Sequence, residues 1–438
     1  MITYFSIVLG KLFIFFSKIF NLGSGSTWPG HIALSLNPNF IKDVLGSHPK
    51  GAKLKIIIIT GTNGKTTTGK LISAIFEKNN KNVLHNSAGA NLLNGLASTL
   101  ISGATVSGKI KADYLIFESD ENAFPEVVEQ INPDYIICLN LFRDQLDRYG
   151  EIDSISKKWK EALGKLSNKT TLILNADDPQ VSYLSKSSKA KCLFFGLDEK
   201  GEKATKHGAD SIYCPKCSSK LIYRRVFFSH LGDWECPSCG LSRLKPGINS
   251  ISHFPLSGSY NKHNALSAVL VARMEKVSDK IIESAYQSFV PAFGRGEKII
   301  YKGKNIQIFL SKNPTGFNES LSTIKLAGGK NLLILLNDRI PDGLDVSWIW
   351  DIQMEELLLG FESVTVSGER CYDMALRIKY SDSSKFQISN FKFQINEDLK
   401  GALNLAMKQT PKDQALYVLP NYSAMLEIRK ILTGKKIL

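Results

Sequence analysis

The sequence is poor in cysteine, histidine and acidic residues, and each shortage excludes something. Seven cysteines in 438 residues, four of them in one cluster, are too few for a disulfide scaffold, so we expect a reducing, cytoplasmic compartment. The 41 Asp+Glu are outnumbered by 55 Lys+Arg, and the net charge of +14 favours anionic partners: nucleotides, nucleic acid or a cytoplasmic membrane face. No histidine follows His263, so Cys371 lacks a later histidine to activate it as a glutaminase nucleophile.

The chain also shows no internal repeat and no signal-peptide cleavage site. Its first twenty residues, MITYFSIVLGKLFIFFSKIF, are apolar around nearly the whole helix but contain Lys11 and Lys18. A lysine in the middle makes an isolated membrane span costly. A helix packed on the protein body is the first interpretation, a helix lying at the membrane interface the second, and a span the third. The following NLGSGSTWPGH is typical of a linker, so residues 1–48 are taken as an N-terminal apolar helix and linker.

Short β-rich runs alternate with helical stretches through the rest of the chain, which predicts an α/β fold with a mainly parallel sheet covered by helices. Hydrophobic residues make up 43% of the chain, as in a globular protein. We expect a central domain at 49–297, interrupted by an inserted module at about 208–245, and a smaller Rossmann-like α/β domain at 298–438. The predicted strands are 55–60, 114–119, 135–140 and 171–176 in the first domain and 306–311, 331–338, 363–368 and 415–421 in the second.

A phosphate-binding loop stands directly after the first predicted strand, in IIIITGTNGKTTTGKL. Glycines let a backbone wrap a phosphate, helix N-terminal amides point at it, a lysine neutralises its charge and a threonine hydroxyl can hold Mg²⁺. Position 59 is Ile, so the spacing is not that of the general Walker sequence. The residues predicted to bind ATP are Gly61, Thr62, Asn63, Gly64, Lys65, Thr66 and Thr67.

The stretch GTNGKTT resembles the ATP loop of the Mur ligase superfamily, whose members use ATP to convert a carboxylate into an acyl phosphate that an amine then attacks. Four further stretches resemble the family in order: FESDE, GSYNKHNALSA, FGRGE and LSKNPTGFN. The resemblance implies that Glu118 and Thr66 bind Mg²⁺. It implies that Asn261, Asn264 and Arg295 contact the nucleotide, with FGRGE ending the central domain. Lys312 is implied to contact substrate or phosphate, and Lys65, Glu118 and Lys312 to serve catalysis.

Two departures concern a second metal site. Amino-acid-adding Mur ligases carry a Mg²⁺-binding histidine in a D-H-x-D-R segment, and this chain has RDQLDRYG with Gln145 at that place. The family's carbamylated lysine has only ambiguous counterparts in Lys157, Lys158 and Lys160.

The cysteine cluster consists of CPKC and CPSC, separated by 18 residues. Four thiolates at this spacing satisfy tetrahedral Zn²⁺ and leave no position open for catalysis, so Cys214, Cys217, Cys236 and Cys239 predict a structural zinc ribbon. An iron–sulfur site or redox pairs are the alternatives. YRRVFF between the knuckles is too weakly basic to indicate nucleic acid.

The ribbon, NLFRDQLDRYGEID and LNDRIPDGLDVSWIWD together resemble one group within the superfamily, the MurT subunits of lipid II isoglutaminyl synthase. That resemblance implies ATP-dependent amidation of the D-glutamate α-carboxylate in the lipid II stem peptide. It further implies a heterodimer with a GatD-type glutaminase that supplies ammonia, lipid II as a substrate at the membrane face, and no nucleic-acid partner. Asp345 matches the aspartate that would complete the partner's Cys-His-Asp triad, whereas Asp342 is interpreted as a turn residue.

Two other functions stay open at this point. A stand-alone Mur or folate-type ligase would add an amino acid without a partner, and the missing histidine and the ribbon argue against it. A zinc-ribbon protein that binds nucleic acid and merely retains an ATP fold is the weaker alternative.

Overall fold

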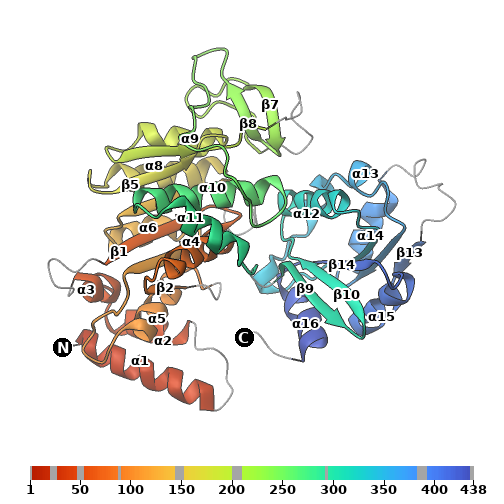
Figure 1. Ribbon diagram of the computed structural model, residues 1–438, viewed down its shortest axis with the longest axis horizontal. Helices are drawn as coiled ribbons and strands as arrows, with labels where there is room; N and C mark the ends of the chain where they lie inside the picture. Colours follow the sequence, from red (N-terminus) through yellow and green to blue (C-terminus); the bar gives the residue numbers. More distant parts are fainter. Residues whose placement is uncertain are drawn as a thin grey trace.

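A computed structural model describes residues 2–19, 27–46, 54–86, 90–143, 152–199, 210–291, 294–381 and 392–434. Two α/β domains lie side by side, with a small hairpin module at one end of the first and the N-terminal helix at its opposite end (Figure 1). No helix within the described ranges is long and apolar enough to cross a membrane.

The first domain is built on a six-stranded, wholly parallel sheet in the order β2-β3-β1-β4-β5-β6. Its strands are β1 (Lys55–Thr60), β2 (Val83–His85), β3 (Tyr114–Ser119), β4 (Tyr135–Cys138), β5 (Thr171–Asn175) and β6 (Lys191–Phe195). The isoleucines at 56–59 are all buried, because a parallel sheet is covered on both faces. The carboxyl ends of β1 and β3 therefore lie side by side, at the edge where such folds bind ligands.

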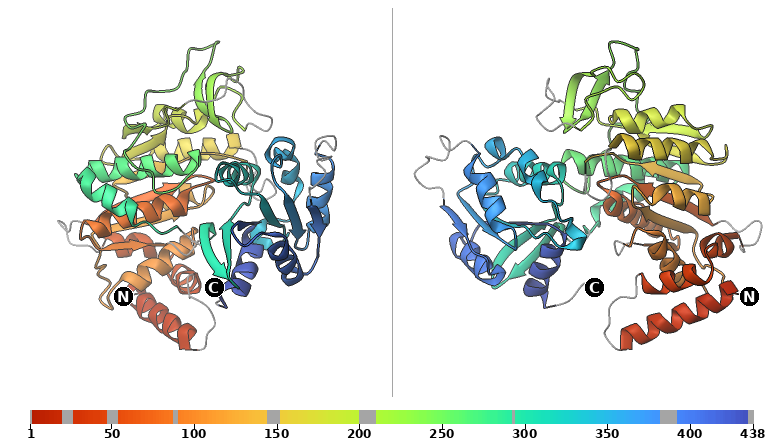
Figure 2. Two further views of the ribbon diagram at one scale, coloured as in Figure 1. Left: turned by 45° about the vertical axis from the view of Figure 1, so that its right-hand side comes forward. Right: turned by 180° about the vertical axis from the view of Figure 1, so that it is seen from behind.

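Helices cover both faces of this sheet (Figure 2). One face carries α4 (Lys65–Lys78), α10 (Ser259–Met274) and α11 (Asp279–Gln287). The other carries α5 (Leu93–Gly103), α6 (Phe124–Gln130), α8 (Ile152–Gly164), α9 (Pro179–Tyr183) and the 3₁₀ turn η1 (Leu184–Lys186). Three N-terminal helices, α1 (Ile2–Ile19), α2 (Trp28–Leu36) and α3 (Phe40–Gly46), pack beside α5.

The inserted module is a two-stranded antiparallel hairpin, β7 (Ile222–Phe228) and β8 (Leu231–Glu235). It is anchored on the loop after β5: Gly232 N–H donates to the Asp177 carbonyl at 3.0 Å, and Trp234 Nε1 donates to the Ala176 carbonyl at 3.1 Å. Below it, the Asp177 carboxylate accepts hydrogen bonds from Arg243 and is 2.7 Å from His263 Nε2 on α10. The hairpin is thus fixed to the body of the first domain.

The second domain has its own six-stranded sheet, in the order β13-β12-β11-β14-β10-β9. Its strands are β9 (Arg295–Tyr301), β10 (Lys304–Phe309), β11 (Asn331–Leu335), β12 (Ser363–Ser367), β13 (Lys392–Ile395) and β14 (Ala415–Pro420), and all pairs are parallel except β9 with β10. Helices α12 (Pro314–Leu326), α13 (Met354–Leu357) and α14 (Cys371–Lys379) cover one face, with the 3₁₀ turns η2 (Ile340–Asp342) and η3 (Ser347–Asp351) nearby. Helices α15 (Leu399–Gln409) and α16 (Tyr422–Thr433) cover the other.

The predicted α/β class with a mainly parallel sheet and a second domain is confirmed, and all eight predicted strands exist. The strands not predicted are β2, β6, β9, β13 and the hairpin pair. β9 matters most, because FGRGE was interpreted as the end of the central domain, whereas Arg295 is the first residue of a strand in the second sheet. The domain boundaries at residues 48 and 297 stay predictions.

Candidate active site

The loop between β1 and α4 has the backbone shape that its glycines allow. Gly61 and Gly64 have φ angles of +136° and +93°, in the region that favours glycine. A Cβ on Gly64 would lie 2.2 Å from Asn264 Oδ1, so α10 approaches the loop as closely as a glycine permits. The loop leads straight into α4, whose first amides and positive dipole end face the same space. This geometry suits a bound phosphate.

Lys65, the first residue of α4, is buried and paired. Its Nζ lies 2.9 Å from Glu121 Oε2 and also donates to the carbonyl of Gly61. Burial raises the pKa of the Glu121 carboxyl, but the charges of Lys65 and Lys312 outweigh burial and hold that pKa below its usual value. A buried lysine is costly without a counter-ion, and Glu121 supplies one here.

Thr66 and Glu118 meet at the carboxyl edge of the sheet. Thr66 Oγ1 donates to Glu118 Oε2 at 2.6 Å, and His85 Nε2 lies 3.0 Å from Glu118 Oε1. Burial would raise the pKa of Glu118, yet the hydrogen bonds from His85 and Thr66 and the charges of His85 and Arg295 together lower it. An ionised carboxylate beside a hydroxyl is a hard-oxygen pair of the kind that Mg²⁺ prefers.

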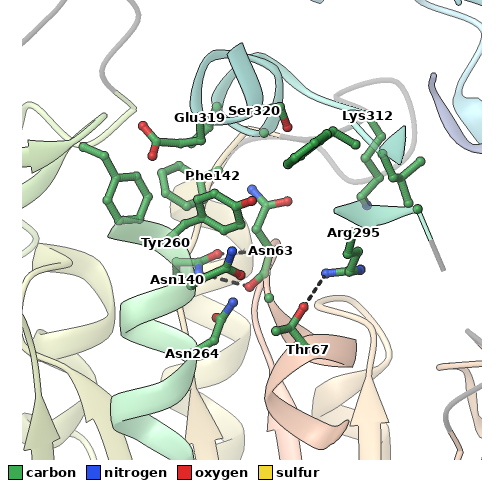
Figure 3. A pocket seen from close by; sticks show the side chains of 18 residues that line it. Asn63, Thr67, Asn140, Phe142, Tyr260, Asn264, Arg295, Lys312, Glu319 and Ser320 are labelled. Carbon is green, nitrogen blue, oxygen red and sulfur yellow. Dashed lines mark hydrogen bonds between the residues drawn. The ribbon is translucent and has the colours of Figure 1, made fainter. Parts of the chain in front are cut away.

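Three asparagines surround the loop. Asn63 N–H donates to Asn140 Oδ1 at 2.9 Å, and Asn140 Nδ2 donates back to the Asn63 carbonyl at 3.1 Å (Figure 3). Among the described residues, the buried Nδ2 atoms of Asn63 and Asn264 have no hydrogen-bond partner. Buried amides without partners are rare, and both line one cavity, so they are available to a polar ligand. Asn261 Nδ2 instead donates to the Ser257 carbonyl at 2.7 Å and helps to fix the start of α10.

A cavity of about 80 Å³ lies between the loop and the second domain. From the second domain, Arg295 Nη1 donates to Thr67 Oγ1 at 3.2 Å (Figure 3). Asn313 Nδ2 also donates to Asn63 Oδ1 at 3.2 Å. Lys312 lies on the same wall, so the second domain contributes two positive charges to the cavity. The other lining residues are Gly64, Asn140, Phe142, Phe228, Tyr260, Asn261, Asn264, Gly294, Phe309, Leu310, Thr315, Gly316, Glu319 and Ser320.

The aromatic side of the cavity is formed by Phe142, Tyr260 and Phe228. Burial raises the pKa of Tyr260 to about 12, so its phenol stays protonated at neutral pH. Phe228 is the last residue of β7, and its ring centroid lies 6.2 Å from that of Phe142 and 5.2 Å from the ring of His263. The cysteine-bearing hairpin therefore reaches the cavity with one side chain.

The four cysteines converge on one point. Their Sγ atoms all lie within 4.8 Å of one another, with Cys214 and Cys239 3.6 Å apart and Cys217 and Cys236 3.5 Å apart. A tetrahedral zinc with bonds of about 2.3 Å places its sulfurs about 3.8 Å apart. Hydrogen bonds from Ser219 lower the pKa of the Cys217 thiol. The donor set thus fits a tetrahedral zinc ion.

The four aspartates of residues 338–351 have four different surroundings. Asp342 is buried and accepts hydrogen bonds from the N–H and hydroxyl of Ser423; burial nevertheless raises its pKa. Asp338 pairs with Arg370 at 3.1 Å, and Asp351 lies 3.6 Å from Arg143 of the first domain.

Asp345 is exposed, as Asp351 is, but its contacts differ from those of the other three aspartates. Within the described part of the chain, its carboxylate accepts hydrogen bonds from Ser347 alone; the Ser347 backbone N–H is 2.8 Å away, and these bonds lower the pKa of the Asp345 carboxyl. Leu344, the preceding residue, is 65% exposed, and Ile340, five residues earlier in the chain, is 79% exposed. Asp345 is not one of the residues that line the cavity.

Sequence reasoning missed several side chains at this site. Glu121 stood in the quoted FESDE, but nothing in the sequence paired it with Lys65. His85 ends the short strand β2, and Asn140 follows β4; a sequence-wide check of polar residues at strand ends would have found both. Phe228 and Asn313 carried no such signal. Of the residues noted at the departures, Gln145 lies outside the described residues. Lys158 Nζ is 3.4 Å from Asn122 Oδ1, and Lys160 lies over the ring of Tyr183.

Comparison with known proteins gives two family matches: residues 59–272 match the Mur ligase middle domain, and residues 310–425 match the MurT ligase C-terminal domain. The chain is 32% identical to the MurT subunit of lipid II isoglutaminyl synthase (glutamine-hydrolyzing) from Streptococcus pneumoniae, over 95% of this chain and 94% of that one. It is 33% identical to the MurT subunit from Staphylococcus aureus, over 82% of this chain and 83% of the relative.

Solved structures agree on the fold. A pseudomurein peptide ligase type C from Methanothermus fervidus superposes with a TM-score of 0.67 at 21% identity, covering 92% of this chain and 84% of that chain. A MurF ligase from Thermotoga maritima, solved in complex with ADP, gives a TM-score of 0.61 at 14% identity, covering 91% and 82%.

Proposed function

The chain belongs to the MurT family of Mur ligase-like subunits, and from this premise we propose that it is the synthetase subunit of a lipid II isoglutaminyl synthase. The reaction is the ATP-dependent amidation of the D-glutamate α-carboxylate in the lipid II stem peptide, within peptidoglycan biosynthesis. The observation that carries the proposal is the cavity, where a phosphate-type loop from one domain faces Arg295 and Lys312 from the other.

ATP is the first substrate that this cavity suits. The amides of the loop and of the start of α4 bind phosphate oxygens, and Lys65, held ready by Glu121, balances their charge. The Nδ2 atoms of Asn63 and Asn264, which have no partner among the described residues, donate to the nucleotide, while Asn261 fixes the helix that carries Asn264. Gly61, Thr62 and Gly64 shape the loop, and Thr67 links it to Arg295.

Thr66 and Glu118 would hold Mg²⁺, which when bound neutralises phosphate charge. The support is their 2.6 Å contact and the lowered pKa of the Glu118 carboxyl, which keeps it ionised. His85 fixes the orientation of that carboxylate.

Amide formation then needs two bond exchanges. The substrate carboxylate attacks the terminal phosphorus of ATP and releases ADP; ammonia next attacks the acyl carbon, phosphate leaves, and a proton is lost from nitrogen. Arg295 and Lys312 stabilise the negative charge that develops on the transferred group, because preorganised cations in a confined site need no reorganisation.

Ammonia comes from a GatD-type glutaminase, which forms a heterodimer with this chain. The exposed Asp345, with its lowered pKa and the exposed Ile340 and Leu344 close to it in the sequence, is suited to meet a partner surface. There its carboxylate would orient the partner's catalytic histidine as the acid of a Cys-His-Asp triad. Asp345 is catalytic in that half-reaction and not in the ATP cavity.

The cysteine hairpin is proposed to be a structural zinc ribbon. Sulfur separations of 3.5 and 3.6 Å match a tetrahedral Zn²⁺ shell, and all four ligands come from the protein. We place the protein in the cytoplasm, peripheral at the inner membrane face, because its proposed substrate is membrane-borne, and we expect no nucleic-acid partner.

The decisive experiment co-expresses the chain with a GatD-like glutaminase from the same genome and follows amidation of lipid II by mass spectrometry. We expect amidation that needs ATP and either glutamine or ammonia. Absence of amidation with an active glutaminase and ATP present would overturn the proposal. Addition of an amino acid by the chain without its partner would instead identify a stand-alone ligase.

A further inference from the structure

The N-terminal helix α1 exposes an unusual amount of apolar surface. Nine of its large apolar side chains are between 39% and 60% exposed. Soluble monomers rarely leave contiguous apolar patches of this kind without a use for them. The nine residues, defined here as the α1 face, are Ile2, Tyr4, Phe5, Val8, Leu12, Phe13, Phe15, Phe16 and Ile19.

The opposite side of α1 is firmly packed on the first domain (Figure 2). Ile7 is 1% exposed and belongs to the core that contains α5. Gly10 allows the close approach, because a Cβ there would lie 2.9 Å from Ile101 and 3.5 Å from Pro29. Lys11 Nζ reaches the carbonyl of Ser102 at 3.4 Å. The exposed side is therefore presented outward by a docked helix.

Composition indicates what this face meets. Aromatic and aliphatic side chains on one side of a helix, five of the nine being Phe or Tyr, are typical of helices that lie in the membrane interface. None of the described helices, α1 (Ile2–Ile19) included, is long and apolar enough to cross a membrane.

Charge around the helix favours an anionic surface. The exposed Lys42 lies on α3, which packs against α1, and the exposed Lys109 follows the turn at Gly108, where a Cβ would lie 3.2 Å from Tyr4. Asp43 is also near; it accepts hydrogen bonds from Thr3 and Asn37 and keeps its negative charge. Lys42, Lys109 and Asp43 together therefore leave a local excess of one positive charge. The whole chain carries +14, which attracts it to anionic lipid.

We propose that the α1 face docks the protein onto the anionic surface of a lipid bilayer, with the helix lying parallel to the membrane and its aromatic side chains among the headgroups. The inference deepens the proposed function by naming the surface that brings the enzyme to a lipid-borne substrate. Binding itself needs neither ATP nor the glutaminase.

The test is flotation of the full chain with vesicles that contain no lipid II. We expect it to float with vesicles of phosphatidylglycerol and phosphatidylethanolamine, to float at least tenfold less with phosphatidylcholine, and to be released in part by 0.5 M salt. The double variant Phe13→Glu with Phe16→Glu should lose at least tenfold of the bound fraction. Its matched control is Ile300→Glu with Leu326→Glu, two residues that are 74% and 85% exposed elsewhere.

Three results would overturn the proposal: no flotation with anionic vesicles, equal flotation of the α1 variant and wild type, or equal loss in the control. A dimer in solution that the α1 variant alone abolishes would assign the face to a second copy instead. Unchanged melting temperatures exclude misfolding. Amidation of detergent-solubilised lipid II by the wild-type chain with its glutaminase is measured in parallel. If the wild-type chain floats with anionic vesicles but does not amidate lipid II, the proposed function is wrong and this inference stands. If it amidates lipid II but does not float, this inference alone is wrong.

Discussion

The buried charged side chains beside the phosphate-type loop are each paired or hydrogen-bonded. Lys65 is balanced by Glu121, and Glu118 is held by Thr66 and His85, so each buried charge has a partner before any nucleotide arrives. Asp345 is exposed, and among the described residues its carboxylate accepts hydrogen bonds from Ser347 alone. Carboxylates close together in the sequence thus divide between buried, interdomain and exposed positions.

The residue Asp345 gives the first prediction. Asp345→Asn should lower glutamine-driven amidation by at least about 100-fold, because an amide cannot orient and charge-balance a catalytic histidine. Amidation driven by added ammonia should be unchanged, as should ATP binding. Glutamine and ammonia rates are measured on the purified heterodimer. Asp338→Asn, in the same stretch and paired with Arg370, is the matched control. Equal loss with both nitrogen sources would move Asp345 into the synthetase site.

His85 gives the second. Replacing His85 by Ala removes a hydrogen bond to Glu118 and should weaken Mg²⁺ affinity about 10–100-fold, the usual effect of removing a support of a metal ligand. Gly69→Ala should act in the same direction, because its Cβ would lie 2.4 Å from His85 Nε2. Mg²⁺ titration of nucleotide binding measures both effects. His253→Ala, an exposed histidine, should change nothing.

A pH profile adds a readout specific to Glu118. Its folded pKa is lowered, so the ionised form is complete above the ordinary glutamate value and is lost only as pH falls through the lowered value. Without His85 this acid limb of Mg²⁺-dependent binding should move to higher pH. An unmoved limb would mean that His85 does not support the carboxylate.

Among the elements, the β7–β8 hairpin joins the four-cysteine cluster to the cavity. Its cysteines lie at one end, Phe228 ends β7, and the turn after β5 fixes its base. The inserted module, which looks self-contained in the sequence, therefore contributes a side chain to the wall of the cavity.

The hairpin prediction follows from this arrangement. Cys236→Ser should release one zinc per chain and weaken ATP binding about tenfold, or about 1.4 kcal/mol, because Phe228 is no longer held against Phe142. Phe228→Ala should weaken ATP binding alike while keeping zinc. Zinc content and nucleotide titration separate the two. Cys192→Ser, a half-buried cysteine of β6, is the control. Full ATP affinity after zinc loss would make the hairpin mere architecture.

For the molecule as a whole, the cavity exists only because two domains meet. The contacts of Arg295 with Thr67 and of Asn313 with Asn63 cross from the second domain to the loop, and Arg143 and Asp351 approach at 3.6 Å. The charge of Lys312 is felt by Glu121 on the first domain. Arg295 and Lys312 thus bring two cations to the cavity from the second domain.

The last prediction concerns this shared charge. Lys312→Met should lower amidation about 100-fold whether glutamine or ammonia supplies nitrogen, because the lost cation stabilises the transferred group and not the glutaminase. Steady-state rates with both nitrogen sources measure it. Lys325→Met is the matched control, because Lys325 lies on α12 of the same domain and its Nζ donates a hydrogen bond to the Glu356 carbonyl. A loss confined to glutamine would instead tie Lys312 to the partner.

The sequence by itself determined the class of the fold, the eight main strands and the phosphate-type loop, because these depend on local periodicity and on glycines at fixed spacing. It also determined the cysteine cluster, whose ligands stand in two short knuckles.

Only the tertiary structure decided which distant side chains meet. It paired Lys65 with Glu121, placed His85 on Glu118, put Arg295 on a strand of the second sheet and brought Phe228 to the cavity. It also sorted the α1 helix into a packed side and an exposed one. Such contacts arise from packing between elements far apart in the chain, and local sequence patterns carry no record of them.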